Sequence, residues 1–449
     1  MNGSFWRFGI STGATLNLDD YSTDVSAERM LLPLDDRRLL SLDLLRAVAI
    51  LLVLYGHITF RIDDNAIGYR FWFILRQMGL IGVDLFYVLS GFLIGSLLLS
   101  EHQSTGGIAV GRFYLRRALR IWPSYFLAVL FGWQWYHLVQ KFHLLPAGSL
   151  EMTSSPARLR DMWPFFAHLQ NYVEPIFGAG AVMQTWTVVS LVHFYLLFPI
   201  ILLIALKLGD GKCGKPIKSL PWIVLGIAVI CFGFRYANAP ATAEEYNAWR
   251  NYFPTHLRLD EPMFGVLAAY FVVQFRAGVE KVMRYWLVIL IASVATLLPT
   301  AVRKEEGPRF LVIWGYTLAA VGCMGFVMLA WWVGQRKTVA TNQPVSLPVR
   351  LLAHLGIWSY SIYLWHQPLA QWMAMKARIR IKLWDSPLHF PIMVFVYLVF
   401  SIGIGALMYY LIEKTALHFR ARFCPRLSTD PESLRPDATA FVQNHSQRL

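Results

Sequence analysis

Three ionisable residues lie inside one apolar stretch near the start of the chain. Residues 41–60 read S-L-D-L-L-R-A-V-A-I-L-L-V-L-Y-G-H-I-T-F and contain Asp43, Arg46 and His57. In a helix, Arg46 and His57 would lie on one face, roughly 16 Å apart along the axis, with Asp43 within about 40° of the same line. The pattern predicts a charged stripe that ends in an imidazole, the group best suited to take up a proton near neutral pH.

A cluster of arginines forms a second group of candidate functional residues. The segment R-R-A-L-R-I-W-P runs from Arg116 to Pro123 and precedes another apolar stretch. Arg116 and Arg120 would share one face of a helix, and guanidinium groups match the geometry of phosphate. The cluster therefore predicts either a docking site for a phosphorylated cytoplasmic ligand or simple anchoring of a helix at the inner side of a membrane.

The composition indicates which elements position these residues. The chain of 449 residues is 56% hydrophobic and 15% charged, with a mean hydropathy of +0.45. A soluble domain of this size would carry more charge. The net charge of +14 comes largely from short loops between apolar stretches, as membrane topology and acidic lipid headgroups require, so no nucleic-acid partner is expected. The four cysteines have no metal-ligand spacing, so no metal site is expected.

Hydropathy predicts an all-α, polytopic membrane protein with about ten transmembrane helices, since each span needs about twenty apolar residues. The predicted spans lie near residues 41–60, 79–99, 121–140, 186–206, 220–236, 262–276, 285–302, 310–333, 351–372 and 390–412. No GxxxxGK[ST] loop is present, which argues against an ATP-driven pump.

The charges between the spans predict the orientation and the domain limits. Most basic loops fall on the side of both termini, which favours a cytoplasmic location for each terminus; the loop at 376–382 alone disagrees. Residues 1–37 are predicted to form a partly disordered cytoplasmic extension, residues 38–415 the membrane domain, and residues 416–449 a disordered cytoplasmic tail.

Five segments, in this order, resemble the acyltransferase-3 family of integral-membrane O-acyltransferases, which modify surface polysaccharides. They are L-D-L-L-R-A-V-A-I-L-L-V-L-Y-G-H (43–57 with the preceding Leu), G-V-D-L-F-Y-V-L-S-G-F-L-I (82–94), R-R-A-L-R-I-W-P (116–123), H-L-R-L-D-E-P-M-F-G (256–265) and Y-S-I-Y-L-W-H-Q-P (360–368). The resemblance covers roughly residues 38–415. It implies about ten helices in a bacterial inner membrane and no bound cofactor.

The resemblance also implies the reaction. An acyl group, acetyl first among the candidates, would pass from acyl-CoA on the cytoplasmic side to a hydroxyl of a polysaccharide, a glycolipid or a small glycoside. Membrane lipids and other glycan-assembly proteins are the further partners it implies. Because an alcohol attacks a thioester poorly while it keeps its proton, the reaction needs a base.

The resemblance assigns His57 as the base, since the family's pattern of a basic residue, ten residues and a histidine is met by Arg46 and His57. Asp84 is the candidate acid that orients His57, with helix-end capping as the alternative. Arg46 either binds the donor or pairs with Asp43 at i, i+3. The candidate donor-binding residues are Arg46, Arg116, Arg117 and Arg120.

Four residues are candidates for the acceptor side: His193, Arg258, Asp260 and His366. Arg258 and Asp260 either position the acceptor or pair with each other. The motif around His366 is explained equally well by helix packing through Ser359 and Ser361.

One segment departs from the family pattern. Similar proteins carry W-S-L-x-V-E-E-Q-F-Y in the fourth span, whereas this chain has W-T-V-V-S-L-V-H-F-Y from Trp186 to Tyr195. Leu191 and Val192 replace the two glutamates, and His193 replaces the glutamine. The departure leaves open a second function, a non-catalytic membrane carrier or partner protein on the same scaffold.

Overall fold

The computed structural model describes residues 40–58, 69–141, 158–173, 182–208, 215–302, 308–340, 345–376 and 389–423. The predicted extension at 1–37 lies outside these residues. In the described part the secondary structure is helical, without strands. The helices are α2 (Leu40–Gly56), α3 (Tyr69–Gln77), α4 (Gly79–Thr105), α5 (Val110–Lys141), α6 (Trp163–Phe166), α7 (Thr185–Leu208), α8 (Ser219–Asn238), α9 (Ala248–Asn251), α10 (Asp260–Gln274), α11 (Arg276–Val282), α12 (Trp286–Val302), α13 (Pro308–Phe310), α14 (Tyr316–Ala340), α15 (Leu347–Lys376), α16 (His389–Met408) and α17 (Lys414–Phe423).

Among the described helices, α4 and α10 make the most extensive contact, and α4 also contacts α2 and α14. Small residues allow the approach, since a Cβ added at Gly91 would overlap the carbonyl oxygen of Pro262 on α10. A Cβ added at Gly265 would likewise overlap the carbonyl oxygen of Val88. Backbones of membrane helices approach to this distance only where one side chain is absent, so the α4–α10 contact is fixed by glycine.

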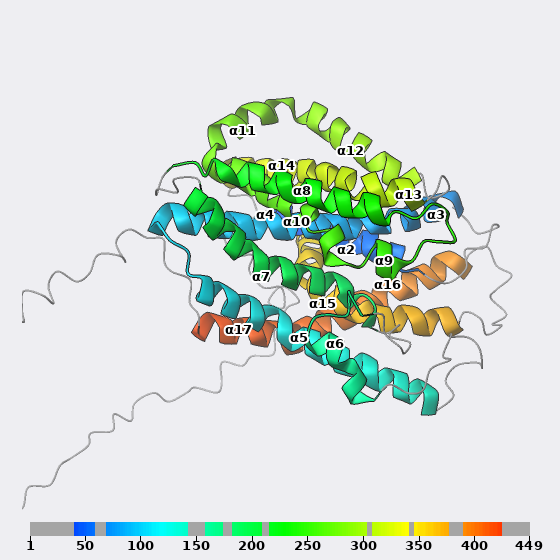
Figure 1. The fold of residues 1–449 in the computed structure, drawn as a ribbon. Helices are drawn as coiled ribbons and strands as arrows, with labels where there is room; N and C mark the ends of the chain where they lie inside the picture. The colour runs from blue at the N-terminus through cyan, green and yellow to red at the C-terminus, as the bar shows by residue number, and fades with distance from the viewer. Residues whose placement is uncertain are drawn as a thin grey trace, which may run out of the picture. The chain divides into compact units, whose positions relative to one another are not determined.

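Helix α2 lies between α4 and α15 and contacts both. On one side, Gly82 of α4 lies against the backbone of Ala49, and on the other, Gly356 of α15 lies against the backbone of Asp43. Helices α11 and α12 run along one edge of the described helices, and α17 lies beside α5 (Figure 1). The charged stripe of α2 therefore has neighbours on two sides that hold its side chains in place.

Each of the ten predicted spans overlaps a helix, but the count of about ten membrane spans is not confirmed. Six helical stretches of the described chain are long and apolar enough to cross a membrane: 71–105, 185–208, 219–238, 276–299, 311–336 and 390–420. Helices α2 and α10, with 17 and 15 residues, are shorter than a full span. These apolar helices and their packing are those of an integral membrane protein.

Two predicted limits differ from the structure. The helix that contains the predicted span at 121–140 begins earlier, since α5 starts at Val110, includes the arginine cluster and continues through Pro123. At the other end, α17 continues to Phe423, past the predicted domain limit at 415. The rest of the predicted tail lies outside the described residues.

Candidate functional site

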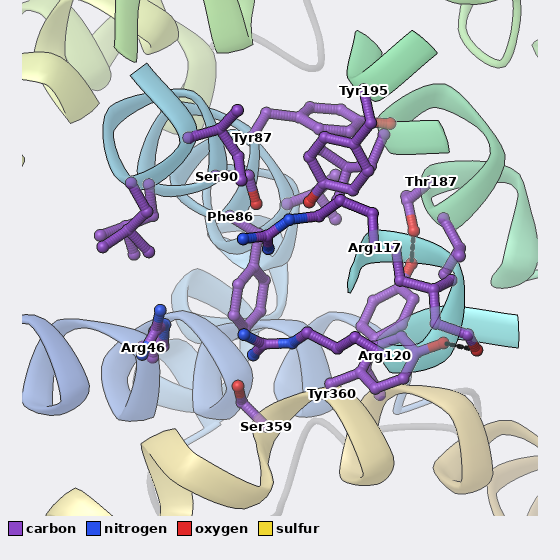
Figure 2. Close-up of a pocket in the computed structure, with 18 residues that line it drawn as sticks. Arg46, Phe86, Tyr87, Ser90, Arg117, Arg120, Thr187, Tyr195, Ser359 and Tyr360 are labelled. Carbon is purple, nitrogen blue, oxygen red and sulfur yellow. Dashed lines mark hydrogen bonds between the residues drawn. The ribbon is translucent and has the colours of Figure 1, made fainter. Parts of the chain in front are cut away.

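A cavity of about 130 Å³ lies where α2, α4, α5, α7 and α15 meet. Its wall is largely apolar, with residues such as Phe86, Leu93, Val188 and Leu191. Figure 2 shows three arginines directed into this space, Arg117 and Arg120 from one side and Arg46 from the other. An apolar cavity with cationic groups suits a ligand that has both an apolar part and an anionic part.

Arg117 and Arg120 are three positions apart on α5 and both line the cavity. The guanidinium of Arg117 lies over the rings of Phe113 and Tyr195, at 5.6 and 5.9 Å, and its buried Nε has no hydrogen-bond partner within the described chain. Neither arginine forms a hydrogen bond or an ion pair with another described residue. Arg116, which the sequence predicts as the partner of Arg120, does not line the cavity.

Arg46 forms the pair with Asp43 that was one of its two predicted roles, and its role in donor binding stays a prediction. Its Nη1 bonds Oδ1 of the buried Asp43 at 2.5 Å, at the i, i+3 spacing, and its side chain lines the cavity. The Asp43 pair neutralises Arg46, so Arg117 and Arg120 are the charges of this wall that an anionic ligand would compensate.

His57 follows the last residue of α2, and the ring of His366 on α15 lies 4.8 Å from its ring, at 74°. Each Nδ1 lies close to a backbone carbonyl oxygen, that of Val53 at 2.8 Å for His57 and that of Tyr363 at 2.7 Å for His366. Because a carbonyl only accepts, each Nδ1 carries the proton and each Nε2 is left as the basic nitrogen. His57 thus has the form that a general base requires.

Asp84 does not orient His57. Its carboxylate pairs with Arg258, whose guanidinium also bonds Glu261 at 2.6 and 3.0 Å. The predicted pair of Arg258 and Asp260 does not form either, because Asp260 pairs with Arg235 at 2.8 Å. All of these side chains are buried. The sequence reasoning missed Glu261 and Arg235, although a charged residue inside an apolar segment was the signal that could have identified both.

The Arg258 guanidinium is further enclosed by aromatic rings, with Tyr252 at 4.5 Å and Tyr316 at 4.6 Å. Arg258 and Asp260 are buried and have no surface to offer an acceptor, although Nη1 of Arg258 has no hydrogen-bond partner among the described residues. The two residues instead join α10 to α4 and α8, which positions the cavity helices.

A family model described as an acyltransferase domain matches residues 39–410. The chain belongs to the acyltransferase-3 family.

Two relatives of this acyltransferase-domain protein are named OatA. The peptidoglycan O-acetyltransferase OatA of Listeria monocytogenes is 26% identical over 340 residues, which cover 73% of this chain and 49% of the relative. The O-acetyltransferase OatA of Staphylococcus aureus is 23% identical over 297 residues, which cover 65% of this chain and 46% of the relative. The chain thus spans about half the length of the curated relatives it matches. No solved structure matches it.

Leu191, where the sequence differs from the pattern that the resemblance implies, lies in the cavity wall. Two positions along α7, a turn of about 200°, His193 points elsewhere, with Nδ1 2.8 Å from Oγ1 of Thr255. His193 therefore does not replace the missing carboxylate at the cavity.

His168 lies in the connection between α6 and α7. Burial and the nearby His193 lower the pKa of His168 to about 4, so its imidazole is neutral at pH 7.

Proposed function

We propose that this protein is a membrane O-acyltransferase that takes an acyl group, acetyl first among the candidates, from acyl-CoA and transfers it to a hydroxyl of a glycan. Family membership supports acyl transfer, the names of the two OatA relatives support an O-acetyl group, and the name of the Listeria relative supports a glycan acceptor. The acyl-CoA donor is inferred from the cavity, and no other bound cofactor is required.

The observation that carries the proposal is the uncompensated pair of guanidinium groups, Arg117 and Arg120, in a largely apolar cavity. A cation removed from water without a partner costs stability, at several kcal/mol in an apolar site. The chain keeps two of them side by side, which is favourable when a ligand supplies the opposite charge. The phosphates of CoA supply it in the fork geometry that arginine prefers, and the apolar wall suits the acylated pantetheine arm.

The reaction requires a path from this cavity to the base. Tyr363 lines the cavity, and its ring lies 5.7 Å from the ring of His366, next to His57. The acceptor hydroxyl would give its proton to Nε2 of His57 as its oxygen attacks the thioester carbonyl. The C–S bond then breaks, and the thiolate takes the proton, leaving an ester and free CoA.

The proposed membrane is a bacterial inner membrane with both termini in the cytoplasm, where acyl-CoA is made. Arg117 and Arg120 would then open to the cytoplasm, while His57 would lie nearer the outer side, since α2 rises roughly 16 Å between Arg46 and His57. A cysteine replacing the exposed Ser104, at the end of α4, should resist an impermeant maleimide in intact cells and react after lysis. Labelling of intact cells would reverse the orientation.

The test of the function is transfer itself. Membranes that contain the protein are incubated with acetyl-CoA labelled in the acetyl group, and the glycan fraction is examined for label that mild alkali releases, as an ester requires. Membranes without the protein are the control. We expect alkali-labile label that depends on the protein.

Leu191 in the cavity wall supports a second candidate, a protein that binds the donor without transferring its acyl group. Binding of acetyl-CoA without transfer to any glycan fraction would favour this candidate. Absence of both binding and transfer would refute the donor site as well.

A further inference from the structure

His366 has surroundings that packing alone does not explain. Its side chain is fully buried in α15, at 0% exposure, so an acceptor would meet the partly exposed His57 instead. Its Nδ1 is satisfied by the Tyr363 carbonyl, whereas its Nε2 has no hydrogen-bond partner within the described chain. An apolar side chain would fill the same space without an unsatisfied nitrogen.

The ring next to His366 is that of the proposed base. The two rings meet edge to face at 4.8 Å, and in such a pair the positive edge of one ring lies against the electron-rich part of the other. A positive charge gained by His57 is attracted to the π-face or the basic nitrogen of a neutral imidazole this close, as long as His366 stays neutral. Two imidazolium ions at this distance would repel each other, so the pair takes up one proton beyond those on the two Nδ1 atoms.

We propose that His366 is a positioning residue for acyl transfer: it orients the ring of His57 and stabilises the imidazolium that forms when His57 takes the acceptor's proton. This inference rests on the proposed function, with His57 as the base. His366 touches neither substrate. The proton passes from the acceptor hydroxyl to Nε2 of His57 and then to the thiolate that leaves as the C–S bond breaks, so His366 gains and loses nothing.

The structure offers a matched control on the same helix. His354 of α15 is also buried, its Nδ1 lies 2.8 Å from the Arg350 carbonyl oxygen, and its Nε2 likewise has no hydrogen-bond partner among the described residues. Its ring contacts Trp358 in place of an ionisable base. A variant at His354 therefore reports the cost of replacing a buried histidine of α15, without the neighbour that the proposal requires.

The experiment uses the full chain reconstituted in lipid vesicles, with labelled acetyl-CoA and the membrane glycan fraction. His366→Asn keeps an N–H donor for the Tyr363 carbonyl but has no basic nitrogen. We expect kcat to fall by about ten- to a hundredfold, as the loss of an interaction with a charged group implies, with the Kd for acetyl-CoA within about twofold of wild type. His354→Asn should keep the wild-type kcat.

A double variant tests whether the two histidines act together. Combined with His57→Gln, His366→Asn should cause no further loss, because the charge that His366 stabilises no longer forms. Wild-type kcat in His366→Asn, or losses that multiply in the double variant, would overturn the proposal. If His366→Asn also loses acetyl-CoA binding, His366→Gln is measured in its place, and loss of binding there too would assign His366 to packing.

The His57 and His366 variants distinguish failure of the proposed base from failure of the proposed role of His366. If His57→Gln transfers label at the wild-type rate, the proposed base is wrong. If His57→Gln is inactive and His366→Asn is as active as wild type, only the role of His366 is refuted.

Discussion

Replacing Arg117 and Arg120 singly by glutamine tests the donor cavity most directly. Each guanidinium would form at least one charge-assisted hydrogen bond with a CoA phosphate, and such a bond contributes about 1.5–3 kcal/mol. The Kd for acetyl-CoA should therefore rise by about ten- to 150-fold in each variant, while kcat at saturating donor changes little. Arg112→Gln is the matched control, since Arg112 lies on the same helix but is exposed and outside the cavity.

A second probe separates phosphate binding from a general disturbance of the cavity. Acetyl-pantetheine has the same acylated arm as acetyl-CoA but lacks its phosphates. Its weaker affinity should be the same in wild type, Arg117→Gln and Arg120→Gln. Binding of both ligands is measured by isothermal titration calorimetry in detergent.

The ligand-free stability should change in the opposite direction. Because neither guanidinium has an ion pair in the described chain, Arg117→Gln removes a costly, partly buried charge and should raise the melting temperature of the free protein. It should also reduce the stabilisation that acetyl-CoA gives. Unchanged acetyl-CoA affinity in Arg117→Gln and Arg120→Gln, or an equal loss of acetyl-pantetheine affinity, would refute the phosphate role and leave the arginines as anchors of α5.

Further predictions concern the base, the helix contacts and the buried histidine. His57→Gln should reduce transfer by about two to four orders of magnitude without weakening donor binding, since an amide cannot take up the proton. Gly91→Ala should destabilise the protein by about 1–3 kcal/mol through its clash with Pro262, whereas Gly226→Ala, with open space around it, should be neutral or stabilise by up to about 1 kcal/mol; thermal unfolding compares them. Because the pKa of His168 is about 4 in the folded protein against 6.5 for a free imidazole, the unfolded chain binds more protons between these values and stability falls as pH falls through that window. His168→Asn should flatten this part of the melting-temperature profile, and an unchanged slope would assign it to other groups.

The sequence by itself determined the class of protein and the positions of its helices. Long apolar runs with little charge can only be helices in a membrane, because backbone groups there must be satisfied within the segment. Helical periodicity also predicted that Arg46 shares a face with His57, and it offered the Asp43 pair, which the structure contains, as one of two roles for Arg46. The order of five motifs identified the family, which the comparison confirmed.

Only the tertiary structure decided which residues meet across helices. The sequence predicted Asp84 as the partner of His57, but Asp84 pairs with Arg258, and the ring next to His57 is that of His366. Helical periodicity could not predict that Arg117 lines the cavity and Arg116 does not. Periodicity determines which residues share a face of a helix, but the direction of that face depends on where neighbouring helices approach. Glycines on α4, α10 and α15 set those approaches by letting backbones touch, and such contacts between distant segments leave no periodic trace in the sequence.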